Sequence, residues 1–157
     1  MAKNLCVIHH SRAGSTALLC DAAVAAAAAV TGTTEGPVEV RRLGAFDAGP
    51  DDVLWADALL LATPAHFGYM SGALKDFFER VYRPCLERSA GLLYALIVKG
   101  DTDVDGAVAS VQKIATGLRW RQVLPPLAVV GDITASDLEA AAELGGTLAA
   151  GLGEGIF

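Results

Sequence analysis

Cysteine and histidine are scarce in this chain, which argues against a fold held together by disulfides or by a metal ion. The three cysteines among 157 residues, Cys6, Cys20 and Cys85, stand at spacings that suit neither a disulfide framework nor a zinc site. Of the three histidines, His9 and His10 have no companions at metal-ligand spacing either. We therefore expect reduced, mostly buried thiols and no metal centre.

Basic residues and long apolar runs are also few. Lys and Arg number 12 against 18 Asp and Glu, which gives a net charge of −6 and a pI of about 4.9. This balance disfavours nucleic acids and anionic membrane surfaces, because both bind clustered basic residues. No apolar run reaches the roughly 18 to 20 residues that cross a bilayer, and the first predicted strand is too short for a signal-peptide core. The sequence predicts a cytoplasmic protein whose partners are small molecules or basic proteins.

Apolar residues, in contrast, are abundant. They make up 53% of the chain, enough at this length for the core of one domain spanning residues 1–157. Short apolar runs predict five strands, at residues 5–8, 38–43, 55–62, 92–98 and 127–130. Helices are expected between and after them, at residues 14–30, 72–83, 104–116 and 137–152.

Strands that alternate with helices indicate a doubly wound α/β fold, a five-stranded parallel sheet with helices on both faces. The strand order 2-1-3-4-5 agrees with the patterns, because strands 1, 3 and 4 are almost entirely apolar, as interior strands of a parallel sheet are. The second strand partly alternates, and Pro125 and Pro126 open the fifth, so both are expected at edges. In this order ligands bind at the switch point between strands 1 and 3, beyond the carboxyl ends of the strands.

Three connections are predicted to converge at that switch point: residues 11–16, 63–70 and 99–103. The first is small and polar and leads directly into a helix. The free backbone N–H groups and the dipole of a helix N-terminus favour an anion, and three hydroxyls and a guanidinium accompany them here. A phosphate group is the expected ligand of this connection.

Two motifs in these connections resemble the flavodoxin-like superfamily, and within it the FMN-binding NAD(P)H:quinone and FMN reductases. Ser11-x-x-Gly14-Ser15-Thr16 is similar to the phosphate loop of these proteins. Thr63-Pro64-Ala65-His66-Phe67-Gly68-Tyr69-Met70-Ser71-Gly72 is similar to their flavin-side loop, and the likeness extends over the whole chain. The resemblance implies a flavodoxin-like fold with FMN as the cofactor.

The resemblance also implies where FMN binds, with its phosphate on residues 11–16 and its ring bordered by residues 63–68 and 99–103. The candidate cofactor-binding residues are Ser11, Arg12, Ala13, Gly14, Ser15, Thr16, Thr63, Pro64, Ala65, His66, Phe67, Gly68, Lys99, Gly100, Asp101, Thr102 and Asp103. No catalytic side chain is assigned from the sequence, because the cofactor supplies the redox chemistry.

The activity that the resemblance implies is NAD(P)H-dependent reduction of FMN or of a quinone-type acceptor, in a homodimer or tetramer. NAD(P)H is the expected electron donor, and a small molecule is the expected electron acceptor. Two alternatives stay open. One is a flavodoxin-type electron carrier that is reduced by a protein partner, and the other is a member of the superfamily that has lost FMN.

Other protein classes fit the sequence less well. Cys6 and Arg12 have the C-x5-R spacing of phosphotyrosine phosphatases, but Cys6 lies within a predicted strand, where no phosphate loop would lower its pKa. A receiver domain would need acidic residues where strand 1 ends in His9 and His10. The G-x-G-x-x-G fingerprint of dinucleotide-binding proteins is absent. Both histidines are expected to be structural.

Overall fold

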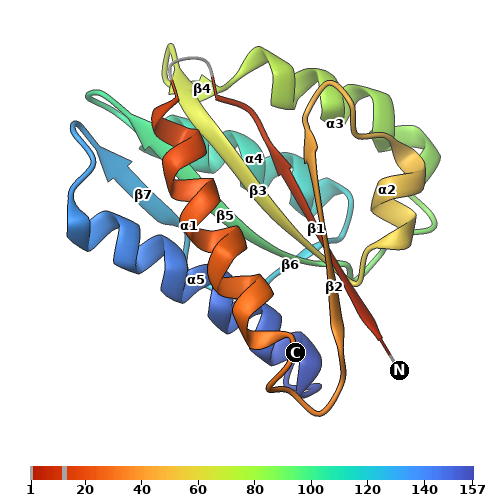
Figure 1. The fold of residues 1–157 in the computed structure, drawn as a ribbon. Helices are drawn as coiled ribbons and strands as arrows, with labels where there is room; N and C mark the ends of the chain where they lie inside the picture. Colours follow the sequence, from red (N-terminus) through yellow and green to blue (C-terminus); the bar gives the residue numbers. More distant parts are fainter. Residues whose placement is uncertain (1, 12–13) are drawn as a thin grey trace.

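A parallel sheet forms the central layer of the protein (Figure 1). The structure is a computed structural model that describes residues 2–11 and 14–157. The main strands are β1 (Lys3–His9), β2 (Val38–Gly44), β3 (Ala58–His66), β5 (Leu93–Gly100), β6 (Arg121–Gln122) and β7 (Leu127–Val130). Their spatial order is β2-β1-β3-β5-β6, and β7 lies on the same side of β5 as β6.

Helices cover both faces of the sheet (Figure 1). The pair α1 (Ser15–Val30) and α5 (Ala135–Gly153) lies on one face. The other face carries α2 (Pro50–Trp55), α3 (Gly72–Cys85) and α4 (Asp105–Gly117). Among the residues that the structure describes, no helix is both long and apolar enough to cross a membrane.

The interior strands contribute to two cores, because successive side chains along a strand point to opposite faces. In β1, Leu5 and Val7 pack in the core beneath α1 and α5, whereas Cys6 and Ile8 pack in the core beneath α2, α3 and α4. All four side chains are fully buried. The predicted doubly wound fold with strand order 2-1-3-4-5 is confirmed, with β5 as the fourth strand.

The fifth strand of this order is in two pieces. β6 pairs with the start of β5 and β7 pairs with its end, and Pro125 and Pro126 stand in the gap between the two pieces. Gln122 holds the connection between the two pieces in place. Its Nε2 donates to Leu124 O at 3.0 Å, and its Oε1 accepts from Gln112 Nε2 of α4 at 2.9 Å. The edge position expected from the prolines is confirmed, whereas β6, with two residues, is too short for any pattern to predict.

Two boundaries around the third strand differ from the prediction. Residues 50–55 form helix α2 where a polar connection and the start of a strand were expected. Pro50 lies in the first turn, where its missing N–H is not needed, and Asp52 Oδ2 accepts a hydrogen bond from Gly49 N at 2.9 Å. β3 therefore begins at Ala58, and it continues to His66 where an irregular loop was expected.

The close packing of α1 against α5 depends on one glycine. A Cβ added to Gly145 would overlap the carbonyl group of Ala23 on α1. A Cβ added to the neighbouring Gly146 would stand 3.7 Å from Ala26 Cβ, an ordinary contact. The absent side chain at position 145 therefore sets how closely the two helices approach.

Gly145→Ala should lower the free energy of unfolding by about 1 to 3 kcal/mol, the usual cost of forcing extra atoms into a packed interface. Gly146→Ala is the matched control, and it should leave that free energy unchanged or raise it by up to about 1 kcal/mol, because alanine favours a helix over glycine. Urea unfolding followed by circular dichroism measures both variants. Equal effects of the two substitutions would contradict the role given to Gly145.

Candidate functional site

A cavity opens at the carboxyl ends of β1, β3 and β5, where a doubly wound sheet binds its ligands. Its volume is about 170 Å³, and residues from all three predicted connections line it. We refer to it as the first cavity. Its lining residues are Ser11, Ser15, Thr16, Pro64, Ala65, His66, Lys99, Gly100 and Asp101.

The start of α1 forms one side of the first cavity. Gly14 precedes the helix with a φ of 89°, a left-handed conformation that glycine adopts without strain. The Ser11 hydroxyl accepts hydrogen bonds from Gly14 N at 3.1 Å and from Ala17 N at 3.2 Å, so it stabilises the turn and satisfies one of the first N–H groups of the helix. No acidic residue stands in the first turn of α1, so no carboxylate offsets the positive end of its dipole there.

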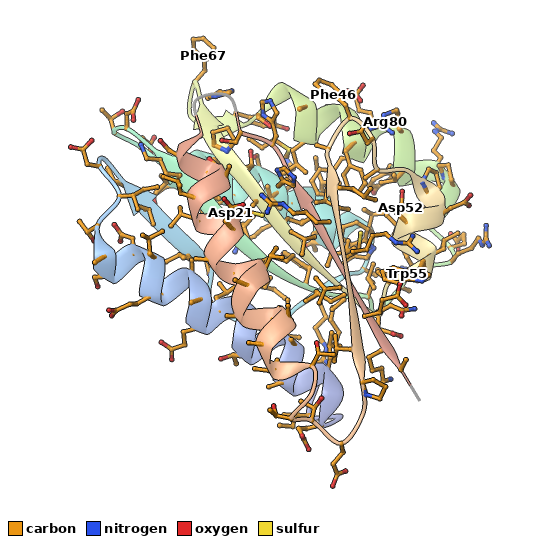
Figure 2. All side chains as sticks on the ribbon, in the orientation of Figure 1. Asp21, Phe46, Asp52, Trp55, Phe67 and Arg80 are labelled. Carbon is orange, nitrogen blue, oxygen red and sulfur yellow. The ribbon has the colours of Figure 1, made fainter. Side chains whose placement is uncertain are left out.

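The end of β3 turns back into β4 (Tyr69–Met70) through a two-residue hairpin turn. Phe67 and Gly68 form its tip with φ angles of 53° and 69°, the left-handed conformation of a type I′ turn. For a phenylalanine this conformation costs about 1 to 2 kcal/mol. The Phe67 side chain is fully exposed and projects into solvent from the tip (Figure 2).

Helix α4 holds this hairpin in place. A Cβ added to Gly106 would overlap Gly68 O, so the first turn of α4 lies directly against the backbone of the tip. Below the tip, Met70 N donates to Ser110 Oγ at 3.1 Å. These contacts with α4 fix the backbone of the turn, and they keep Phe67 in its strained conformation.

The end of β5 supplies a charged pair to the first cavity. Only 11% of the Lys99 side chain is exposed, and its Nζ lies 2.9 Å from Asp101 Oδ1, whose side chain is 92% exposed. Gly100 between them packs tightly, because a Cβ there would come within 3.0 Å of Ala65 Cβ. The first cavity therefore contains a lysine ammonium whose charge is balanced from the solvent side.

Every residue that lines the first cavity is among the candidates from the sequence. Some of the other candidates instead form hydrogen bonds that support the neighbouring backbone. Thr63 is fully buried, and its hydroxyl accepts from Ser71 N at 3.0 Å at the base of the hairpin. Asp103 Oδ1 accepts from Asp105 N at 3.0 Å at the start of α4. Gly14, Phe67, Gly68, Thr102 and Asp103 do not line the first cavity. Arg12 and Ala13 lie outside the described residues.

A second cavity, which the sequence did not predict, lies between the ends of β1 and β2 and has a volume of about 300 Å³. Its lining residues are His9, His10, Ser11, Gly14, Ala17, Gly44, Ala45, Phe46 and Asp47. The ring of His10 is centred 6.3 Å from that of Phe46 and 6.3 Å from that of His66 in the first cavity. The one signal in the sequence is the position of two histidines directly after an interior strand, a pattern that equally suits structural residues.

Cys6 lies in the middle of β1 and is fully buried. Burial, and to a smaller extent the Asp52 carboxylate, raise the pKa of its thiol to about 12, while the Arg41 guanidinium acts in the opposite direction. A thiol in this environment stays protonated, which opposes a phosphatase-type nucleophile. Among residues 2–11 and 14–157, no cluster of three or more His, Cys, Asp or Glu side chains is arranged to hold a metal ion.

These features define a flavodoxin-like α/β protein with a ligand cavity at its switch point. A flavodoxin from the domain Archaea is similar in fold, with a TM-score of 0.78 over 93% of this chain and 96% of that chain, at 16% identity. A WrbA-like flavodoxin from Agrobacterium tumefaciens gives a TM-score of 0.75 over 94% of this chain and 95% of that chain, at 17% identity.

The sequence comparisons define the family more closely. A flavodoxin of Aquifex aeolicus (strain VF5) is 35% identical over 75 residues, a match that spans 48% of this chain and 38% of that flavodoxin. The family model described as NADPH-dependent FMN reductase matches residues 10–133, well over half of the chain. The chain belongs to this family, and its resemblance to the flavodoxin-like superfamily is confirmed.

The buried thiols yield a test of the fold around β1. Burial raises the pKa values of Cys6 to about 12 and of Cys20 to about 11, so neither thiol should react with a thiol reagent at pH 8 in the native protein, whereas the urea-unfolded chain should react at all three cysteines. Stability should also fall as the pH rises above the ordinary thiol pKa of 9.0, because the unfolded chain releases protons that the folded chain keeps. Rapid labelling of Cys6 or Cys20 in the native protein would contradict this burial.

Proposed function

We propose that the first cavity binds one FMN per chain and that the protein is an NAD(P)H-dependent reductase of FMN or of quinone-type acceptors. The observation that carries the proposal is the convergence of three segments. The start of α1, the end of β3 and the end of β5 all line the same cavity. Each segment has the chemistry that one part of FMN requires, and membership of the FMN reductase family supports the assignment.

The phosphate of FMN would bind at the start of α1. Ser15 and Thr16 bring hydroxyl groups beside the first N–H groups of the helix, and the first turn contains no carboxylate that would oppose an anion. Ser11 would act by holding the turn, since its oxygen already accepts two backbone hydrogen bonds. Arg12 enters the proposal from the sequence alone.

The flavin ring would lie between residues 64–66 and residues 99–101. The first segment offers the apolar surface of Pro64 and Ala65, and the second offers the ammonium group of Lys99. At about 170 Å³ the cavity is smaller than the roughly 300 Å³ of an ordinary ligand site, so it would enclose only part of the FMN molecule. One side of the ring would remain accessible from solvent. A contact between the ring and Phe67, expected from the sequence, stays a prediction.

An accessible ring favours direct reduction by a nicotinamide nucleotide. FMN, once bound, supplies the hydride-transfer chemistry, while the chain supplies binding, orientation and the charges around the ring. In the balanced reaction, NAD(P)H and one proton from solvent reduce a quinone to a quinol and leave NAD(P)⁺. The chain then needs no acidic or basic side chain beyond those that hold the cofactor.

One observation favours the electron-carrier alternative. The chain has a net charge of −6 and exposes the Asp101 carboxylate beside the first cavity, and an acidic protein surface favours docking of a basic protein donor. Assembly into a homodimer or tetramer and a cytoplasmic location both stay predictions.

The chain should bind FMN more tightly than riboflavin, because the donors at the start of α1 serve only a phosphate. Thr16→Val should weaken FMN binding by about 1 to 3 kcal/mol, the cost of losing a hydrogen bond to a charged group, and should leave riboflavin binding unchanged. Thr116→Val, at an exposed position on α4, is the matched control. Titration monitored by flavin fluorescence measures all of these affinities.

Equal affinities of the wild-type chain for FMN and riboflavin would exclude a phosphate site at residues 11–16. Failure to bind either flavin would instead identify a family member that has lost FMN.

The FMN-loaded protein should lose its visible flavin absorbance on rapid mixing with NADH or NADPH and recover it on addition of a quinone. Stopped-flow absorbance follows both steps without knowledge of the natural acceptor. Absence of bleaching by either nucleotide, together with reduction by a flavodoxin reductase, would establish the electron-carrier alternative.

A further inference from the structure

The second cavity adjoins the first, and apart from Ser11 and Gly14 none of its lining residues takes part in the proposed binding of FMN. Ser11 lines both of them. The rings of His66, His10 and Phe46 follow one another at centroid separations of 6.3 Å, from the wall of the first cavity to the second. An elongated ligand with one end at the flavin ring could therefore place its other end beyond the carboxyl ends of β1 and β2.

Phe46 is an exposed aromatic side chain on a well-supported loop. It is 66% exposed, yet the backbone on both sides of it is held by Arg80 of α3, whose Nη2 donates to Ala45 O at 2.8 Å and whose Nη1 donates to Ala48 O at 2.7 Å. Figure 2 shows Phe46 and Arg80 near the end of the molecule that also carries Phe67. The loop is further tied to β1, because Ala45 N donates to His9 O at 2.8 Å. An exposed ring held in this way is preorganised to stack against a planar ligand.

Asp47 provides a hydrogen-bond acceptor immediately beyond the end of β2. Its carboxylate lies close over Gly44, since a Cβ added to that glycine would stand 3.1 Å from Asp47 Oδ2. In doubly wound folds that bind dinucleotides, an acidic residue near this position accepts from the ribose hydroxyls of the adenosine half. The likeness extends only to this half, because the glycine fingerprint that cradles a pyrophosphate is absent from the connection after β1.

We propose that the second cavity binds the adenosine half of the nicotinamide dinucleotide, with the adenine ring stacked on Phe46 and the ribose hydroxyls donating to Asp47. The inference rests on the proposed function, because the nicotinamide half of the same molecule would lie at the flavin ring. A volume of about 300 Å³ is at the lower end of the range for small-molecule sites, which suits a nucleoside fragment.

The Asp47 carboxylate favours NADH over NADPH. Among the described residues that line it, Asp47 carries the only carboxylate, and there is no lysine or arginine. Burial lowers the pKa of His9 and the neighbouring Arg42 lowers it further, so both favour the neutral imidazole. The Asp47 carboxylate would repel the 2′-phosphate of NADPH, and none of these side chains supplies a cation to offset that repulsion. The 2′-hydroxyl of NADH would instead donate a hydrogen bond to Asp47.

The test compares NADH with reduced nicotinamide mononucleotide, which lacks the adenosine half. Wild-type protein loaded with FMN should show a KM for NADH at least about tenfold below that for the mononucleotide, as expected for one stacked base. Phe46→Ala should raise the KM for NADH toward that of the mononucleotide and leave the KM for the mononucleotide unchanged. Asp47→Asn should reduce the preference for NADH over NADPH.

Controls and a direct binding measurement accompany the kinetics. Ile156→Ala and Glu139→Gln alter an exposed apolar and an exposed acidic residue outside both cavities and should change none of these values. Isothermal titration calorimetry with ADP-ribose, which cannot reduce flavin, should show binding to the wild type that is weakened about tenfold by Phe46→Ala.

The possible results separate the two proposals. Equal KM values of the wild type for NADH and for the mononucleotide would overturn the adenosine site and leave the reductase proposal in place. Absence of ADP-ribose binding to the wild type would overturn the adenosine site as well. Failure of both reduced nucleotides to bleach the flavin would overturn the proposed function and, with it, this inference.

Discussion

Parallel pairing of β1 with β3 brings together two strands whose following helices lie on opposite faces of the sheet. The pairing runs from Leu5 opposite Ala58 to His9 opposite Ala62, and His10 N extends it by donating to Ala62 O at 3.0 Å. Because α1 and α3 then leave in opposite directions, the chain diverges at this edge and leaves space beyond the strands. Both cavities border the end of β1, so the positions of both depend on this one ladder.

Most of the fold could be predicted because apolar runs report burial directly. Strands β1, β3 and β5 are apolar on both faces, and in a chain of alternating elements such runs are typical of the interior strands of a parallel sheet. Helix α2 was not predicted because six residues beginning Pro-Asp-Asp are typical of a turn. Only the hydrogen bond from Gly49 N to the Asp52 carboxylate distinguishes this helix start from a turn. Local composition cannot report a contact of that kind.

The first cavity was predictable and the second was not, for a physical reason. Residues such as Ser15 and Lys99 follow directly from strand ends, and the carboxyl ends of parallel strands meet at one edge. The conformation of Phe67 depends instead on α4, which is distant in the sequence and reaches the hairpin through Gly106 and Ser110. Likewise, the position of Phe46 depends on hydrogen bonds from Arg80 of α3.

The break between β6 and β7 has a consequence for behaviour at high concentration. An outer strand normally presents a row of unpaired backbone groups to which another chain can add a strand of its own. Here Pro125 and Pro126 remove two N–H donors from the middle of that row, and Gln122 already engages Leu124 O. A neighbouring molecule would therefore find no continuous ladder to extend, and the sheet is protected on this side from edge-to-edge aggregation.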